Sequence, residues 1–422
     1  MKGKKLKCFG LALGCLTASF FLQGCGAESD KIEIEIVQYK PEAANYFKTV
    51  EAEFNAANDR IHLTISSPND AMTILKTRFI REDYPDIIGI GGDINYSYFV
   101  DAQILADVSD YEGLKDINQG YLDIAESLEL VPTDGTYIVP YVANAAGILY
   151  NRDMFAAHGW EIPETWSELM QLCDKIQAEG ILPFYFGFKD TWTCLAPWNA
   201  MAVELSPSDT AKQVNKGQTT FTEEYRNLAE KYVTLLPYGP EDPFAYGYND
   251  ACTAFARGES AMYPIGSYAA PQILSVNPDL NIDSFVMPAS DNKEDQTLNS
   301  GIDLGFCITA ECENKEAAYE VLDFLLEYEN MQKYIDAQNA VPCKNGDFKL
   351  ASMLDGMLSF IEEGNMTDYQ DHYYPSEMSV DALLQTFLIE KDVNAFLTKF
   401  DTDWQRYNRD IIRLVQEYEQ GN

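Results

Sequence analysis

The chain has 422 residues, and its 67 Asp and Glu residues outnumber its 30 Lys and Arg residues, which gives a formal net charge of −37 at pH 7. A surface this acidic repels phosphate groups, so the composition excludes nucleic acid as a partner and argues against a basic patch that binds anionic lipid. The chain is also longer than one hydrophobic core usually supports, so we expect two lobes.

The first 24 residues have the features of a secretory signal peptide. Lysines at positions 2, 4, 5 and 7 precede an apolar run at 8–22, which is too short for a stable membrane-spanning helix. The sequence Leu22-Gln23-Gly24-Cys25 resembles the lipobox of bacterial lipoproteins. That resemblance implies cleavage before Cys25, a lipid on its thiol, and a tether at 25–30 that holds the protein on the extracytoplasmic face of the cell membrane. The alternative is an ordinary secretory signal with an incidental cysteine.

The first folded segments alternate strands with helices. Isoleucines alternate with charged residues at 31–38 and predict a strand, and Pro41 opens the helix that follows. Further strands are expected at 61–65 and 86–91, with a helix between them that Asp70 is placed to cap. This order of elements predicts a parallel α/β sheet.

The rest of the chain continues as a mixture of strands and helices. Strands are expected at 136–141, 147–150, 182–188, 261–265, 282–286 and 304–309. Helices are expected at 151–158, 165–180 and 250–257, and from Lys315 onward the chain is mostly helical. The last helix carries an apolar stripe that we interpret as a seam packed on the core, formed by Leu397, Phe400, Trp404, Tyr407, Ile411 and Leu414.

Neither the cysteines nor the histidines form a recognisable metal motif. Six cysteines follow the leader without CxxC spacing, at 173, 194, 252, 307, 312 and 343. The three histidines are far apart, and none is near a cysteine in sequence. We therefore expect no metal and no cofactor. Buried free thiols are favoured, and Cys307 and Cys312 are the nearest pair in sequence if a disulfide forms.

Several segments, in order, resemble the extracellular solute-binding proteins of ABC sugar importers, the family that includes maltose-binding protein. They are YPDII at 84–88, VPYVAN at 139–144, GILYNRD at 147–153, PETWSEL at 163–169, FARGESAM at 255–262, GFCIT at 305–309 and NKEAA at 314–318. The resemblance implies a periplasmic-binding-protein-like fold, in which two α/β lobes joined by a multi-strand hinge hold a ligand between them. By analogy, lobe 1 is 31–142 plus 288–340 and lobe 2 is 143–287 plus 341–422, with hinge crossings near 141–143, 286–288 and 339–342.

A sugar site needs polar side chains and aromatic planes, and ligands of open α/β sheets bind beyond the carboxyl ends of the strands. From position and from the resemblance, we expect ligand contacts from Gln38, Tyr39, Asp93, Asn95, Asn144, Trp192, Trp198, Tyr268, Asp303, Tyr373 and Tyr374. Asn144 is an amide where the maltose-binding relatives carry a carboxylate, so their sugar preference does not transfer directly. For the aromatic candidates, packing in the core is the alternative role.

The expected function is capture of a carbohydrate, most simply an oligosaccharide, by hinge closure and its delivery to a membrane permease. We expect a monomer that is not an enzyme. One alternative keeps the fold and changes the ligand to a polyamine or another non-sugar solute, which the acidic composition suits. Another is a secreted glycoside hydrolase, since paired carboxylates and aromatic side chains also describe such active sites.

Overall fold

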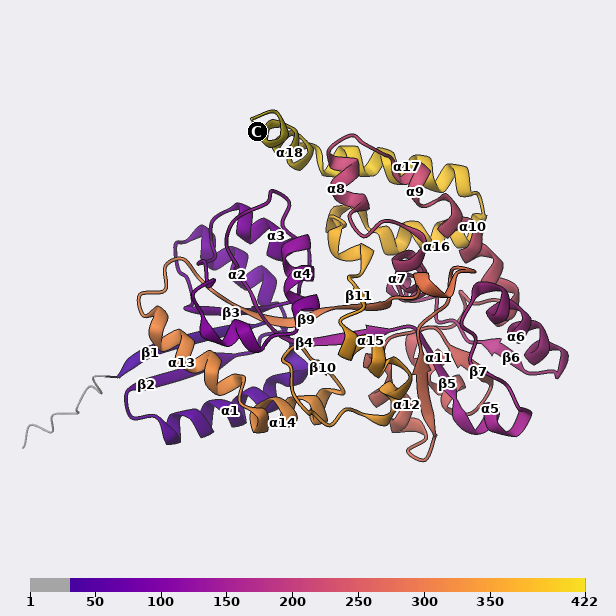
Figure 1. Cartoon of the computed structure of the whole chain (residues 1–422), viewed down its shortest axis with the longest axis horizontal. Helices are drawn as coiled ribbons and strands as arrows, with labels where there is room; N and C mark the ends of the chain where they lie inside the picture. Colours follow the sequence, from indigo (N-terminus) through magenta and orange to yellow (C-terminus); the bar gives the residue numbers. More distant parts are fainter. Residues whose placement is uncertain (1–30, 422) are drawn as a thin grey trace, which may run out of the picture.

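The computed structural model describes residues 31–421 and contains two β-sheets, each covered by helices (Figure 1). The first sheet has the strand order β10-β4-β9-β3-β1-β2, with β11 paired to β9 beside this path. Its strands are β1 (Ile32–Gln38), β2 (Ile61–Ser66), β3 (Ile87–Ile90), β4 (Val139–Ala146), β9 (Leu298–Ile308), β10 (Val341–Pro342) and β11 (Met366–Thr367). β1 pairs in parallel with β2 and β3, as predicted, but β9 pairs antiparallel with β3 and β4, so the sheet is mixed.

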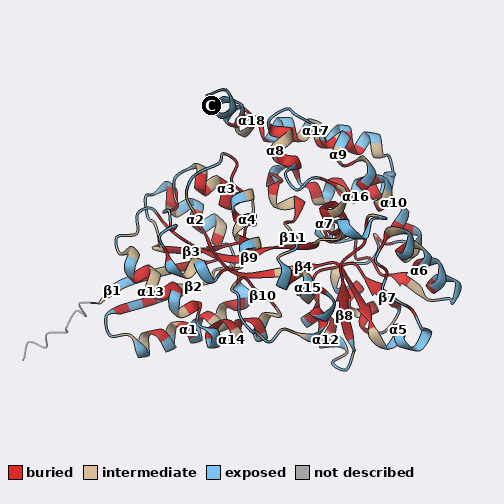
Figure 2. Ribbon diagram, in the orientation of Figure 1, coloured by how far each residue is buried: buried red, intermediate tan, exposed pale blue. Residues whose placement is uncertain are grey.

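Helices cover both faces of the first sheet (Figure 1). They are α1 (Ala44–Ala57), α2 (Ala71–Ile80), α3 (Ile94–Asp101), α4 (Gln119–Ser127), α13 (Lys315–Leu325) and α14 (Tyr328–Gln338). Asp70 occupies the position before α2, but its side chain makes no capping hydrogen bond, whereas Asp93 does cap α3. The apolar faces of these helices and the strands between them are buried (Figure 2).

The second sheet has the order β6-β7-β5-β8. Its strands are β5 (Ile148–Asn151), β6 (Leu182–Phe184), β7 (Ser260–Tyr263) and β8 (Ile282–Phe285). The helices around it are α5 (Arg152–His158), α6 (Trp166–Ala178), α7 (Leu195–Leu205), α8 (Thr210–Asn215), α9 (Phe221–Glu224), α10 (Arg226–Leu235), α11 (Tyr248–Ala256) and α12 (Ala270–Val276). The predicted two-lobe α/β architecture is confirmed.

One residue, Gly147, separates β4 in the first sheet from β5 in the second. A Cβ atom at this position would lie 2.4 Å from the carbonyl oxygen of Phe285 and 2.6 Å from the side chain of Met357. Only glycine therefore allows the chain to pass from one sheet to the other in this close packing. The predicted residue boundaries of the two lobes remain a prediction.

The C-terminal helices are α15 (Leu358–Glu363), α16 (Val380–Glu390), α17 (Val393–Tyr407) and α18 (Arg409–Gly421). The predicted single last helix is wrong, because it is interrupted at Asn408. Leu397, Phe400 and Trp404 of the predicted stripe are buried, but Tyr407 is 39% exposed and Leu414 is 42% exposed. The turn rotates α18, so that Ile412 and Val415 are the buried residues after it.

All six cysteines between residues 31 and 421 are free thiols, as the sequence favoured, and all except Cys312 are buried. In this part of the chain, no cluster of His, Cys, Asp and Glu side chains is arranged to hold a metal ion. The helices described lack the combination of length and apolar character that crossing a bilayer requires. The predicted leader, Cys25 and the tether lie outside the described residues.

Candidate functional site

The candidate site begins on the neighbouring strands β4 and β9. Asn144 on β4 pairs with Gly301 on β9, and its side-chain Nδ2 donates to Asp303 Oδ1 at 3.4 Å. The other atom of this amide, Oδ1 of Asn144, is buried and has no hydrogen-bond partner. A buried acceptor without a donor costs free energy, so this position suits an added donor.

The end of β1 contributes two side chains to Asp303. The Tyr39 hydroxyl donates to the backbone oxygen of Asp303 at 2.5 Å, and Lys40 Nζ contacts both carboxylate oxygens, at 2.9 and 2.8 Å. Burial lowers the pKa of the Lys40 ammonium, but Asp303 and Glu42 outweigh that effect and raise the pKa from its ordinary value. Lys40 is therefore a cation that neutralises Asp303 within the fold.

A segment at 368–372 lies directly on Gly301. A Cβ atom at Gly301 would lie 2.4 Å from Asp368 Oδ1, 2.8 Å from His372 Cε1 and 2.9 Å from the ring of Tyr369. Glycine at this position lets the segment approach β9. Oδ2 of Asp368 and the hydroxyl of Tyr369 are buried without hydrogen-bond partners. Asn144, Asp368 and Tyr369, which each carry one unpartnered polar atom, thus lie around one glycine.

His372 carries a positive charge among carboxylates. Its Nδ1 is 2.8 Å from Asp368 Oδ1. Burial lowers the pKa of the imidazole, but the charge and hydrogen bond of Asp368, together with the charges of Asp371 and Asp93, raise it to about 9. Burial raises the pKa of Asp368, and His372 opposes that shift. We call the residues Tyr39, Lys40, Asn144, Asp303, Asp368, Tyr369 and His372 the Asp303 cluster.

Aromatic rings of the second lobe extend toward this cluster. Trp192 is 41% exposed, and its ring centroid lies 6.1 Å from that of Tyr268 and 5.0 Å from that of Tyr248. Tyr268 lies close enough to Tyr369 that its hydroxyl contributes to raising the pKa of Tyr369, after the larger effect of burial. A sugar needs polar atoms that bond its hydroxyl groups and an aromatic plane that packs on its ring, and this region offers both.

Tyr39, Asn144, Tyr268 and Asp303 of the predicted ligand residues therefore lie at or beside the Asp303 cluster. Asp93 is near enough to influence His372, and its side chain also accepts the backbone N–H of Asn95 at 2.8 Å. Asn95 itself is held by Lys76, whose Nζ lies 2.9 Å from its Oδ1.

Four predicted ligand residues have other surroundings. Gln38 is fully buried and holds the turn after β1 through Lys40 and Ser67. Trp198 is also fully buried, between Tyr225 and Phe396, and bonds to Tyr374. Tyr373 and Tyr374 are each 5% exposed. For these side chains, the structure supports packing rather than ligand contact.

Sequence reasoning missed Lys40, Asp368, Tyr369, Asp371 and His372. The segment at 368–375 is dense in aromatic and ionisable residues, and that density was the available signal. Of this segment, the prediction included only the two adjacent tyrosines, Tyr373 and Tyr374. Which residues of such a segment face the site depends on its contact with Gly301, which local sequence does not reveal.

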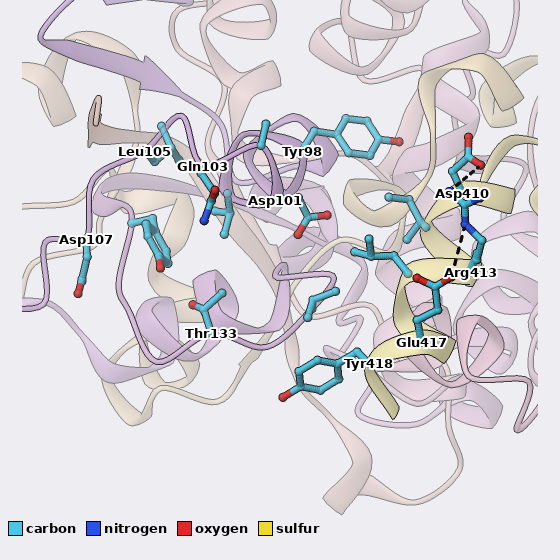
Figure 3. A pocket seen from close by; sticks show the side chains of 16 residues that line it. Tyr98, Asp101, Gln103, Leu105, Asp107, Thr133, Asp410, Arg413, Glu417 and Tyr418 are labelled. Carbon is cyan, nitrogen blue, oxygen red and sulfur yellow. Dashed lines mark ion pairs between the residues drawn. The ribbon is translucent and has the colours of Figure 1, made fainter. Parts of the chain in front are cut away.

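A separate hollow of about 860 Å³ lies between the end of α3 with the loop after it and one face of α18 (Figure 3). Its walls include Tyr98, Asp101, Tyr137, Leu414 and Tyr418. None of the predicted ligand residues lines it. Arg413 at its edge is turned toward Asp410 and Glu417 on its own helix, at 3.7 and 3.9 Å (Figure 3). The hollow is open to solvent and is distinct from the Asp303 cluster.

The family of the chain follows from comparison with protein-family models. Residues 40–332 match the model described as "Bacterial extracellular solute-binding protein". The chain belongs to this family. This confirms the family that the sequence segments indicated, and the two lobes are those of a solute-binding protein.

Relatives cover most of the chain. A "Multiple sugar-binding protein" of Streptococcus mutans is 27% identical over 342 residues, which are 78% of this chain and 80% of that protein. The apo-form of RafE from Streptococcus pneumoniae has a TM-score of 0.78 at 24% identity and covers 92% of this chain and 98% of its own. RafE in complex with raffinose has a TM-score of 0.72 at 24% identity, covering 92% and 100%. At this identity, the solved structures establish the fold.

Proposed function

We propose that this solute-binding protein captures an oligosaccharide between its lobes and delivers it to the membrane subunits of an ABC importer. The observation that carries the proposal is that three residues around Gly301, namely Asn144, Asp368 and Tyr369, each have an unpartnered buried polar atom. Tyr268 lies near Tyr369, and Trp192 adjoins Tyr268. Sugar hydroxyls both donate and accept, so they complete all three groups while a ring packs on the aromatics. The name of the Streptococcus mutans relative, a multiple sugar-binding protein, and the raffinose bound by RafE support the same ligand class.

Binding by hinge closure requires ligand contacts from both lobes. The Asp303 cluster offers them, because Asn144 and Asp303 belong to the first sheet, while Asp371, next to His372, is held by Asn199 of α7 at 2.8 Å. We further propose that Cys25 carries a lipid, that the monomer is held on the extracytoplasmic face of the cell membrane, and that the ligand leaves chemically unchanged. The predicted signal at 1–24 supports the anchor.

A polyamine is the second candidate, because Asp93, Asp303, Asp368 and Asp371 gather at this site. Two of these carboxylates already have cationic partners, since Lys40 contacts Asp303 and His372 contacts Asp368. Carboxylates that already have cationic partners attract a cationic ligand less strongly than free carboxylates do. The aromatic and unpartnered polar groups therefore favour the sugar.

The test is calorimetric titration of the mature chain with raffinose, stachyose, maltotriose, chitotriose and spermidine, with product analysis by mass spectrometry. We expect saturable binding of at least one oligosaccharide, with no cleavage. Tyr369→Phe should then raise its Kd about three- to tenfold, since the variant loses one hydrogen bond. Tyr334→Phe is the matched control, because its hydroxyl is also buried and unpartnered but its ring packs among Tyr46, Phe47 and Tyr141. Binding of spermidine alone, or hydrolysis of the sugar, would overturn the proposal.

A further inference from the structure

The hydroxyl groups of Ser127 and Tyr373 form a hydrogen bond of 2.7 Å. Ser127 is the last residue of α4, and its Oγ also donates to the carbonyl oxygen of Ile124 at 2.7 Å. A serine hydroxyl has one proton, so Ser127 is the acceptor and Tyr373 the donor in the bond between them. Tyr373 is 5% exposed and directly follows the 368–372 segment of the Asp303 cluster.

The bond joins parts of the molecule that belong to different packing units. Ser127 ends α4, which packs on β4 and β9 of the first sheet. The neighbours of Tyr373 in sequence are fixed to the second lobe: Asp371 bonds Asn199 at 2.8 Å, and Tyr374 accepts from Trp198 at 3.3 Å. Figure 1 shows α4 over the first sheet and α7 among the helices on the side of the second sheet, where α7 packs on α10 and also contacts β9. Tyr373 therefore ties the lobe that anchors its segment to the helix of the other lobe.

A second contact reaches the same end of α4. Lys212 Nζ on α8 lies 3.4 Å from the carbonyl oxygen of Glu126. Burial lowers the pKa of Lys212, while the nearby charges of Glu129 and Glu126 oppose that shift. Adjacent residues at the end of one helix thus accept donors from two separate elements, the 368–374 segment and α8. Glu126 accepts through its backbone carbonyl oxygen, which also accepts the backbone N–H of Glu129 at 3.1 Å, whereas Ser127 accepts through its hydroxyl.

We propose that Tyr373 is a positioning residue for ligand binding. The pairing of β11 with β9 holds the start of the 368–372 segment on the first sheet, and the bond from Tyr373 to Ser127 holds its other end, so that Asp368 and Tyr369 keep their places beside Gly301. Tyr373 contributes no surface to the ligand, because its ring is buried and its hydroxyl is committed to Ser127. The inference rests on the proposed function only in taking the Asp303 cluster as the ligand site.

Tyr373 is the donor and Ser127 the acceptor, so substitutions at the two positions should weaken ligand binding to different extents. Tyr373→Phe removes the donor and leaves Ser127 an acceptor that still donates to Ile124. Ser127→Ala leaves a buried Tyr373 hydroxyl without an acceptor, which costs more than removal of both groups. We therefore expect the Kd for raffinose to rise about threefold in Tyr373→Phe and about tenfold in Ser127→Ala. The double variant should match Tyr373→Phe rather than multiply the two effects.

The experiment combines titration of the full mature chain with raffinose and hydrogen exchange of the ligand-free protein. Faster exchange in both single variants, confined to 366–374 and the end of α4, supports the positioning role. Tyr374→Phe is the control: it lies next to Tyr373 but bonds only within its own lobe, so it should lower the melting temperature and leave the Kd unchanged. Unchanged exchange at 366–374, or effects that multiply in the double variant, overturn the inference. If the unaltered protein fails to bind raffinose, the exchange result still decides the positioning role, and only the proposed ligand is in question.

Discussion

The indole nitrogen of Trp198 donates a hydrogen bond to the hydroxyl of Tyr374 at 3.3 Å, and Tyr374 in turn donates to Tyr225 at 2.9 Å. All three rings are buried, and Phe221 and Phe400 pack around them. This aromatic cluster holds α7, α9, α10 and α17 together. Trp198 therefore belongs to the packed core of these helices.

Replacing Trp198 should reduce stability and leave sugar selectivity unchanged. Trp198→Phe leaves a cavity and removes the donor to Tyr374, and we expect the free energy of unfolding to fall by about 2–3 kcal/mol. Denaturant unfolding followed by circular dichroism measures this loss. A change in the order of preference among the oligosaccharides that bind would contradict the assignment of Trp198 to the core.

Replacing Trp192 should have the opposite result. Its ring is 41% exposed and partly supported by Tyr248 and Tyr268, so Trp192→Ala removes little buried area. We expect the melting temperature to change by no more than about 2 °C, because exposed substitutions have small effects. The Kd for the sugar should rise about tenfold through loss of a stacking surface. An unchanged Kd, measured by calorimetry, places the ligand away from this indole.

The ion pair of Lys40 and Asp303 should behave as a coupled pair. Lys40→Met leaves the Asp303 carboxylate without its cation at a largely shielded position, and we expect a loss of about 1–3 kcal/mol in unfolding free energy. Adding Asp303→Asn should recover part of that loss, because the uncompensated charge is then removed. Independent, additive losses in the two single variants would show that the pair is too well solvated to matter.

His372 should make stability depend on pH. Its pKa in the fold is raised to about 9 from the ordinary 6.5, because Asp368, Asp371 and Asp93 outweigh burial. The stabilisation is therefore fully present below about pH 6.5 and is lost as the pH rises through about 9. Asp303 lies near the same segment and adds negative charge. Melting curves from pH 6 to pH 10 should fall more steeply for the unaltered protein than for His372→Gln.

Glu204 should oppose stability at alkaline pH. Burial raises the pKa of this carboxyl to about 7, although the backbone N–H groups of Ala289 and Ser290 donate to its Oε2 at 2.7 and 2.9 Å, while Oε1 is buried and unpartnered. With a folded pKa above the ordinary 4.5, its favourable contribution is present below about pH 4.5 and is lost as the pH rises through about 7. Glu204→Gln keeps the acceptor, so we expect it to be more stable than the unaltered protein by about 1–3 kcal/mol at pH 8 and to show no gain at pH 4.

The spacing of apolar and capping residues predicted those helices and strands that depend mainly on their own sequence. Alternating isoleucines predicted β1, and Gly159 ends α5 as expected, while Asn151 caps this helix instead of forming its first residue. Long-range pairing determined what the pattern missed. β9 begins at Leu298 rather than Leu304, because the polar residues between them are held as a strand by pairing with β4. Strand propensity alone does not favour Asn299, Ser300 and Gly301.

The candidate site shows the same division. Tyr39 was predicted because it follows the first strand, and Asn144, Tyr268 and Asp303 were predicted from the family resemblance; the structure places these four residues at or beside the Asp303 cluster. Asp368, Tyr369 and His372 reach that edge from a turn that follows a two-residue strand, β11. Their placement depends on the absence of a side chain at Gly301, more than 60 residues earlier in the chain. The local sequence pattern around residues 368–372 gives no sign of this contact with Gly301.

The free cysteines have a practical consequence for measuring how the lobes move. Burial raises the pKa of the thiols of Cys173, Cys194, Cys307 and Cys343, and it raises the pKa of Cys252 to about 12, so at neutral pH they are protonated as well as inaccessible. Only Cys312, among residues 31–421, is partly accessible. In a chain that begins after Cys25 and carries a substitution at Cys312, pairs of fluorophores or spin labels attached to cysteines introduced on the two lobes would report the distance between the lobes.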